Sequence, residues 1–177
     1  MNDVAAEAGM SPGNLYRYFP SKHAIVAGLV ECDRAEMRDD FAALAASSDF
    51  LGALAALGQK HFKELPRERA ALCLEIWAEA TRDDAIARIN AEIDGEVEAS
   101  MIELFERARS EGTIDAKVDP RAFATIMSLL ANGLFVRRAV ARNHDPDREI
   151  AFVFAIVRAL FSGQIPLAPM ADPETAS

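Results

Sequence analysis

The chain has 177 residues, of which 51% are hydrophobic and 27% are charged, as is typical of a globular protein. This length can bury a core in one domain, or in one domain with a small appendage. A formal net charge of −9 argues against a histone-like DNA binder, because nonspecific affinity comes from neutralising phosphates. An acidic protein with no polyanionic partner is the alternative that composition leaves open.

The first twenty residues predict two short helices joined by a tight turn. Asn2 or Asp3 can cap a first helix, and Gly9 then supplies the left-handed backbone that ends it. Ser11 followed by Pro12 is a typical start for a second helix, since serine caps and proline suits the first helical turn. This arrangement predicts a helix-turn-helix, the unit that places a helix in the major groove of DNA.

The second of these helices carries polar and aromatic side chains that suit contacts with phosphates. Tyr16, Arg17 and Tyr18 are unfavourable on a solvated helix unless something contacts them, and Lys22 follows at the start of the next helix. Hydroxyl and basic groups of this kind bind phosphate oxygens. A plain helical hairpin at the end of a bundle would explain the turn but not the aromatic residues.

The rest of the chain reads as helices throughout. A long helix is expected from Ser21 to Ala46, and Asp49 caps the next one. A further helix is expected to begin at Pro66. Another is expected to begin at Asp83 or Asp84 and to end at Gly112. The sequence therefore predicts one all-α body behind the helix-turn-helix.

The last two expected helices are apolar around most of their circumference. One runs from Asp119-Pro120 to about Asn143, and the other begins at Asp147 and ends at Gly163. Such helices need cover on every side, which a second copy can supply through a four-helix interface. The residues expected at this dimer interface are Phe123, Met127, Leu130, Leu134, Val153, Phe154, Val157 and Phe161. The first of the two helices has a second apolar face, formed by Leu129, Gly133, Val136 and Val140. The alternative to a dimer interface is that the apolar helix is buried inside a monomer.

The segment DVAAEAGMSPGNLYRYFPSKHAIV closely resembles the DNA-binding domain of TetR (tetracycline-repressor-like) transcription regulators. The resemblance implies that the groove-facing start of the recognition helix is formed by Ser11, Pro12, Gly13 and Asn14. Asn14 is the best candidate for a base contact, because an amide can bond adenine in a bidentate way. Tyr16, Tyr18 and Lys22 would contact phosphates.

The family has a further helix before the equivalent of Asp3. We therefore expect a truncated DNA-binding head. The side chains that the missing helix would cover are expected to be partly exposed: Val4, Ala8, Leu15 and Phe19. A dimeric small-molecule binder that has lost DNA binding is the corresponding alternative to a working regulator.

The stretch EGTIDAKVDPRAFATIMSLLANGLFVRR and its surroundings resemble the betaine-regulator type of C-terminal domain in this family. The resemblance implies a cytoplasmic repressor that binds double-stranded operator DNA as a homodimer and is released by a small organic effector. The candidate effector contacts are His61, Glu75, Trp77, Phe105 and Asn132. We expect a head and connecting helix at 1–46, an effector and dimerisation domain at 47–163, and a loose tail at 164–177.

Other classes of function find little support in the sequence. No histidine stands three residues after a glutamate, so a di-iron bundle is not expected, and no phosphate loop or dinucleotide fingerprint is present. A Ser/His/Asp hydrolase stays open, although nothing resembles a nucleophile elbow. We expect no enzyme activity, no cofactor and no metal. No apolar run is expected to be long enough to cross a membrane, and the two cysteines are expected to be free thiols.

Overall fold

The computed structural model describes residues 1–143, 145–165 and 167, and all regular structure among them is helical, as predicted. Two short helices at the start form the head, and the third helix leads from the head into the body. The helices in chain order are α1 (Asn2–Glu7), α2 (Pro12–Tyr18), α3 (Lys22–Ala46), α4 (Phe50–Phe62), α5 (Arg67–Ala80), α6 (Asp84–Ser110), α7 (Pro120–Val140) and α8 (Pro146–Phe161).

Most helices begin where a short polar side chain accepts a hydrogen bond from a free backbone N–H. The Ser11 side chain accepts from the Asn14 N–H, and the Asp49 side chain accepts from the Gly52 N–H. Asp145 caps α8, so this helix begins one residue earlier than the predicted Asp147 start. Helix α7 ends at Val140, before the predicted Asn143.

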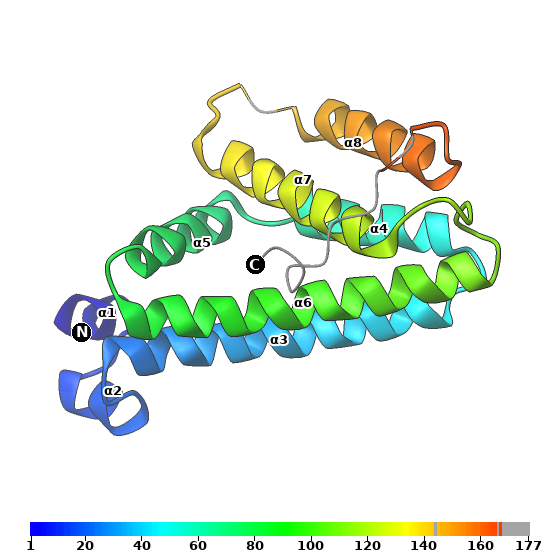
Figure 1. The fold of residues 1–177 in the computed structure, drawn as a ribbon. Coiled ribbons are helices and arrows are strands. Elements are labelled where there is room, and N and C mark those ends of the chain that lie inside the picture. Colours follow the sequence, from blue (N-terminus) through cyan, green and yellow to red (C-terminus); the bar gives the residue numbers. More distant parts are fainter. Residues whose placement is uncertain (144, 166, 168–177) are drawn as a thin grey trace.

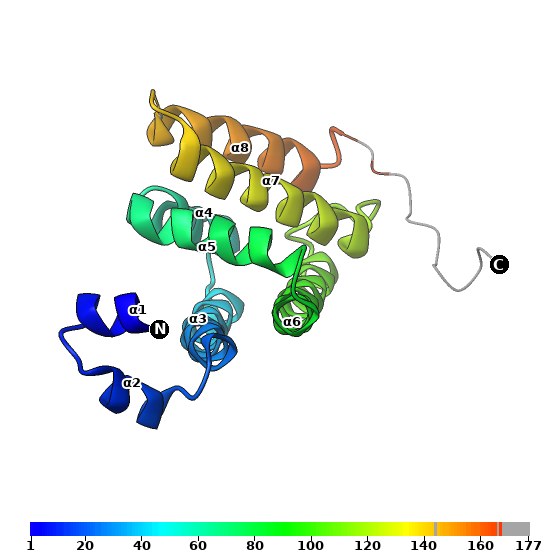
Figure 2. The ribbon, with the colours of Figure 1, turned by 90° about the vertical axis from the view of Figure 1, so that its left-hand side faces the viewer.

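The helices are stacked in three tiers (Figure 2). Helices α3 and α6 lie side by side and run in the same direction, with the head at the end where α3 begins (Figure 1). Helices α4 and α5 form the middle tier, and α7 and α8 form the outer tier. The long α3 therefore connects the head mechanically to the body.

A cluster of phenylalanine rings holds the body together where α4, α6, α7 and α8 meet. The ring centroids of Phe105 and Phe123 are 4.5 Å apart, and those of Phe123 and Phe161 are 4.9 Å apart, both in edge-to-face geometry. Phe50 adds a fourth ring, 5.9 Å from Phe161. Phe123 is 0% exposed, so this cluster is the centre of the hydrophobic core.

The cluster corrects part of the predicted dimer interface. Phe123, Leu134, Val157 and Phe161 are buried within the chain itself, so they are not available to a second copy. Met127, Val153 and Phe154 are partly buried and pack against the same core, while Leu130 is also partly buried. The sequence identified an apolar helix pair but not which side of each helix faces inward.

Helix α7 also corrects the expectation about membranes. By length and composition alone it could cross a membrane, and it is the one such helix among the described residues. It packs against α4, α5, α6 and α8, however, and a core helix of a folded protein passes the same test. This feature is therefore weak evidence for a membrane span.

Candidate functional site

The head consists of α1, a turn at Gly9 and α2. Gly9 has a φ of +63°, the left-handed conformation that the sequence analysis required of it. Ala5 is fully buried and Leu15 is 4% exposed, so the two helices cross closely at small and apolar side chains. The expected exposure of Val4 and Ala8 is found, whereas Leu15 is covered, contrary to expectation.

Helix α2 presents its polar residues outward. Ser11, Pro12, Gly13, Tyr16, Arg17 and Tyr18 are all exposed, and Asn14 is half-buried. The Arg17 guanidinium donates to Asn14 Oδ1 at 2.9 Å and lies over the Tyr18 ring. This internal bond orients the amide while leaving its N–H groups and a second lone pair of the oxygen for a base edge.

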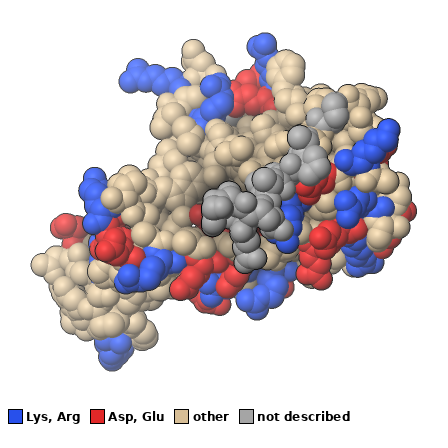
Figure 3. All heavy atoms as spheres, in the orientation of Figure 1, with Lys and Arg blue, Asp and Glu red and all other residues tan. Residues whose placement is uncertain are grey.

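The head is poor in charge compared with the body. The lobe made by α1 and α2 is largely uncharged, whereas charged side chains crowd the surface along α3 and α6 (Figure 3). Residues 1–22 hold two acidic and two basic side chains, Asp3 and Glu7 against Arg17 and Lys22. A neutral head limits nonspecific attraction to DNA, so binding must depend on well-placed contacts.

Two ion pairs tie the start of α3 to the body. The Lys22 ammonium lies 2.8 Å from a Glu79 carboxylate oxygen at the end of α5, and His23 Nε2 lies 2.7 Å from Asp83 Oδ2. Hydrogen bonding from Lys22 lowers the pKa of Glu79, and hydrogen bonding from His23 lowers that of Asp83. The predicted phosphate contact Lys22 is thus held by a carboxylate of the body in this structure.

A cavity of about 270 Å³ opens between α3, α4, α5 and α7. Its lining is mostly charged on the α3 side and includes Phe135 of α7 on the apolar side. The lining residues are Asp33, Glu36, Met37, Lys60, His61, Glu64, Leu65, Pro66, Arg69, Cys73 and Phe135. Burial raises the pKa of the Cys73 thiol, so this thiol is a weak nucleophile at neutral pH.

This cavity includes only one of the five residues predicted to contact an effector. His61 lines it. Trp77 does not, although the centroid of its ring lies 6.1 Å from that of the lining residue Phe135. Glu75 and Asn132 are exposed on the surface and line neither described cavity. Phe105 belongs to the core cluster, which corrects its assignment as an effector contact.

The sequence did not predict the carboxylates of α3 as site residues: Asp33 and Glu36 line the cavity, and Asp40 lies outside its lining. Glu36 and Asp40 are four residues apart and share one face of α3, and Lys60 bonds to both carboxylates, at 3.0 and 2.8 Å. His61 Nε2 lies 2.7 Å from Asp40 Oδ2. The four-residue spacing was the available signal, but it is also the ordinary pattern of a solvated helix face.

A second cavity, of about 350 Å³, is a groove between α4 and α8. Its apolar floor includes Leu51 and Phe154, and the ion pair of Lys63 with Asp147 lies at its edge. The Phe154 ring packs directly onto the backbone of Gly58. A Cβ atom at residue 58 would lie only 2.8 Å from this ring, so a contact this close requires glycine. This groove does not touch α3, so it has no direct route to the head.

Comparisons with known proteins match both parts of the chain. A family model described as "BetI-type transcriptional repressor, C-terminal" matches residues 52–162, and one described as "Bacterial regulatory proteins, tetR family" matches residues 1–29. The chain belongs to the TetR family of transcriptional regulators. This is a family of regulators that generally have no enzymatic activity. None of the curated proteins searched matches the chain.

Solved structures agree with this TetR-family assignment at the level of the fold. A TetR-family transcriptional regulator from Rhodococcus sp. superposes with a TM-score of 0.75 at 20% identity, covering 91% of this chain and 86% of that one. GusR from Salmonella enterica gives a TM-score of 0.72 at 22% identity, covering 89% and 82%. The arrangement of the eight helices in the described part of the chain is therefore a known TetR-family architecture.

Proposed function

We propose that this TetR-family regulator is a cytoplasmic repressor, active as a homodimer, that leaves its operator when a small organic effector binds. The observation that carries the proposal is the path from the 270 Å³ cavity to the head. The cavity is lined by Asp33, Glu36 and Met37 of α3, and α3 begins at Lys22 beside the recognition helix. A ligand that favours one position of α3 would shift the two heads between DNA-binding and nonbinding spacings, by no more than its differential affinity.

In this proposal the head reads DNA through α2. Ser11, Pro12, Gly13 and Asn14 enter the major groove, and Tyr16, Arg17, Tyr18 and Lys22 contact the backbone. The exposed aromatic rings of Tyr16 and Tyr18, 47% and 61% exposed, support this assignment.

The effector would occupy the cavity beside His61 rather than the groove between α4 and α8. Only the first of these adjoins α3, and it combines an apolar wall at Phe135 with several charged groups. A pocket that is partly apolar with a few polar anchors suits a small organic molecule.

Dimerisation in this proposal uses the outward faces of α7 and α8. Leu129, Val136 and Val140 are 66%, 40% and 60% exposed, and with exposed Gly133 they form one stripe of α7. Phe152 and Ile156, 60% and 42% exposed, form the matching stripe on α8. Large apolar side chains that share the faces of two adjacent helices support a covered interface.

Fluorescence anisotropy with labelled DNA from the gene's own upstream region tests the proposal. Specific binding that weakens on addition of salt and is reversed by an effector supports a repressor. A stable dimer that binds small molecules but shows no preference for this DNA supports the alternative, a binding module without DNA activity. The neutral head and the Lys22–Glu79 ion pair are the observations that favour this second candidate.

A further inference from the structure

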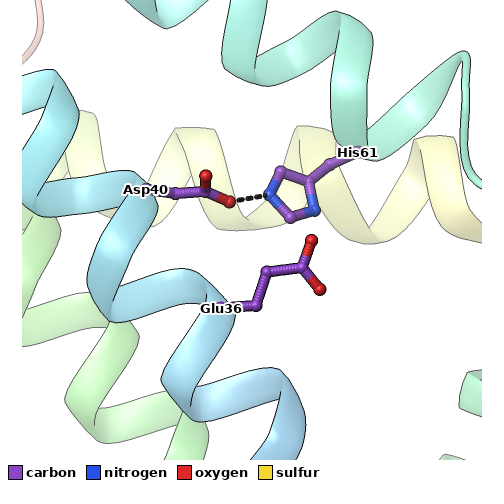
Figure 4. Close-up of side chains that lie close together, drawn as sticks. All are labelled: Glu36, Asp40 and His61. Atoms are coloured by element: carbon purple, nitrogen blue, oxygen red, sulfur yellow. Dashed lines mark hydrogen bonds and ion pairs between the residues drawn. The ribbon is translucent and has the colours of Figure 1, made fainter.

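Three side chains that can bind a metal ion converge at the boundary between α3 and α4. Glu36, Asp40 and His61 each offer one ligand atom, and these atoms all lie within 4.8 Å of one another. The two carboxylates project from successive turns of α3 toward the imidazole of α4 (Figure 4). All three residues are partly buried, so the groups are held by packing, and two of them, Glu36 and His61, line the cavity.

The surroundings of this cluster carry excess negative charge. Four carboxylates lie in or beside the cavity, those of Asp33, Glu36, Asp40 and Glu64. They face two permanent cations, Lys60 and Arg69, and Arg69 is already engaged by Asp33 and Glu36. Lys63 also attracts Glu64 but is paired with Asp147, so carboxylates still outnumber permanent cations here. This imbalance favours the binding of a cation.

The Lys60 ammonium would compete with a metal ion for two of the three ligands. It bonds Glu36 and both oxygens of Asp40, but its side chain is 42% exposed, so it can swing into solvent. A divalent ion would thus exchange with an ammonium and would not enter an empty space.

We propose that Glu36, Asp40 and His61 form a binding site for a first-row divalent metal ion, which displaces the Lys60 ammonium. One imidazole and two carboxylates suit Zn²⁺, Mn²⁺ or Co²⁺, and water from the adjoining cavity would complete the coordination. The four-residue spacing of Glu36 and Asp40 did not identify this site, because the third ligand comes from the next helix and only the packing of α4 on α3 brings it close.

Metal binding would fasten α3 to α4. Glu36 and Asp40 belong to the helix that leads to the head, whereas His61 belongs to the body. Any effect of the metal on DNA binding rests on the function proposed above, but the site itself does not.

The test is calorimetric titration of the full chain with Zn²⁺ at neutral pH, with Co²⁺ absorption spectra as a second readout. We expect one ion per chain, with d–d bands typical of nitrogen and oxygen ligands. His61→Gln should weaken binding by at least about tenfold, because it removes the imidazole ligand. Lys60→Met should strengthen binding by about tenfold, because it removes the competing charge next to the ion.

His23→Gln is the matched control. His23 bonds Asp83 at the same 2.7 Å distance, but no third ligand joins this pair among the described residues. Circular dichroism of each variant verifies folding. Absence of binding, equal loss in the two histidine variants, or weaker binding by Lys60→Met would overturn the proposal. These outcomes are independent of whether the protein binds DNA.

Discussion

The outward face of α7 and α8 gives the sharpest test of the proposed assembly. Replacing Phe152 and Ile156 by glutamate should separate the dimer, because charge would enter an apolar interface. These side chains are 60% and 42% exposed, so roughly half of each is free for burial by a partner. Half of a full side-chain burial is worth about 1 kcal/mol, and a symmetric interface contains four such side chains. The double variant should therefore lose about 4 kcal/mol of dimerisation free energy, which raises the dimer dissociation constant about 10³-fold.

Sedimentation velocity over a range of concentrations measures this effect directly. Leu72→Glu is the matched control, since Leu72 is 39% exposed but lies on α5, away from the proposed interface. The control should leave the dimer intact, and thermal melting should show that the double variant still folds. A double variant that remains a dimer like the unsubstituted chain would refute the assignment of this face. Val157 is unsuitable for the test, because it is 0% exposed and its replacement would disrupt the core.

Three further predictions concern the head, the core and the charged cavity. Asn14→Ala should relax base preference at one operator position by about 1–3 kcal/mol, whereas Lys22→Ala should weaken all DNA sequences alike and reduce the salt slope by about one, both measured by anisotropy. Equal effects on matched and scrambled DNA would contradict this division. Phe123→Ala should lower the free energy of unfolding by about 3–5 kcal/mol in denaturant titrations, because it opens a cavity among packed rings. Burial alone would raise the pKa of Asp40, but hydrogen bonds from Lys60 and His61 lower it overall, below its ordinary 3.8. Lys60→Met should therefore lower the free energy of unfolding at pH values above 3.8, and this loss should vanish as the pH falls through the lowered pKa of Asp40. Acid unfolding of both proteins, followed by circular dichroism, measures the difference. A difference that stays the same at low pH would count against the pairing of Lys60 with Asp40.

Local sequence was sufficient for the helices and for the head. Caps at Ser11, at Asp49 and at Asp83 or Asp84 were predicted from single residues and their neighbours. Ser11, Asp49 and Asp83 accept the expected backbone hydrogen bonds. Gly9 likewise has the positive φ that the turn required. Capping and turn formation involve groups within a few residues, so the chain specifies them without long-range information.

The candidate cavity was predicted only in part. His61 lines it and stays a predicted effector contact, but Phe105 lies in the core, and Glu36 and Asp40 were not predicted as site residues. A carboxylate pair four residues apart on a helix has the same pattern whether it faces water or another helix. The position of α4 over α3 decides which of these applies.

The sequence by itself determined that the chain is helical, where most of its helices begin, and that a specific helix-turn-helix motif stands at its start. The tertiary structure decided which faces of α7 and α8 are core and which are exposed, and it brought His61 to Glu36 and Asp40. The division has a physical reason. Caps, turns and periodicity are set by hydrogen bonds and sterics within one or two turns, whereas a helix that is apolar on several sides can bury any of them. Only packing against distant segments of the chain selects the buried face.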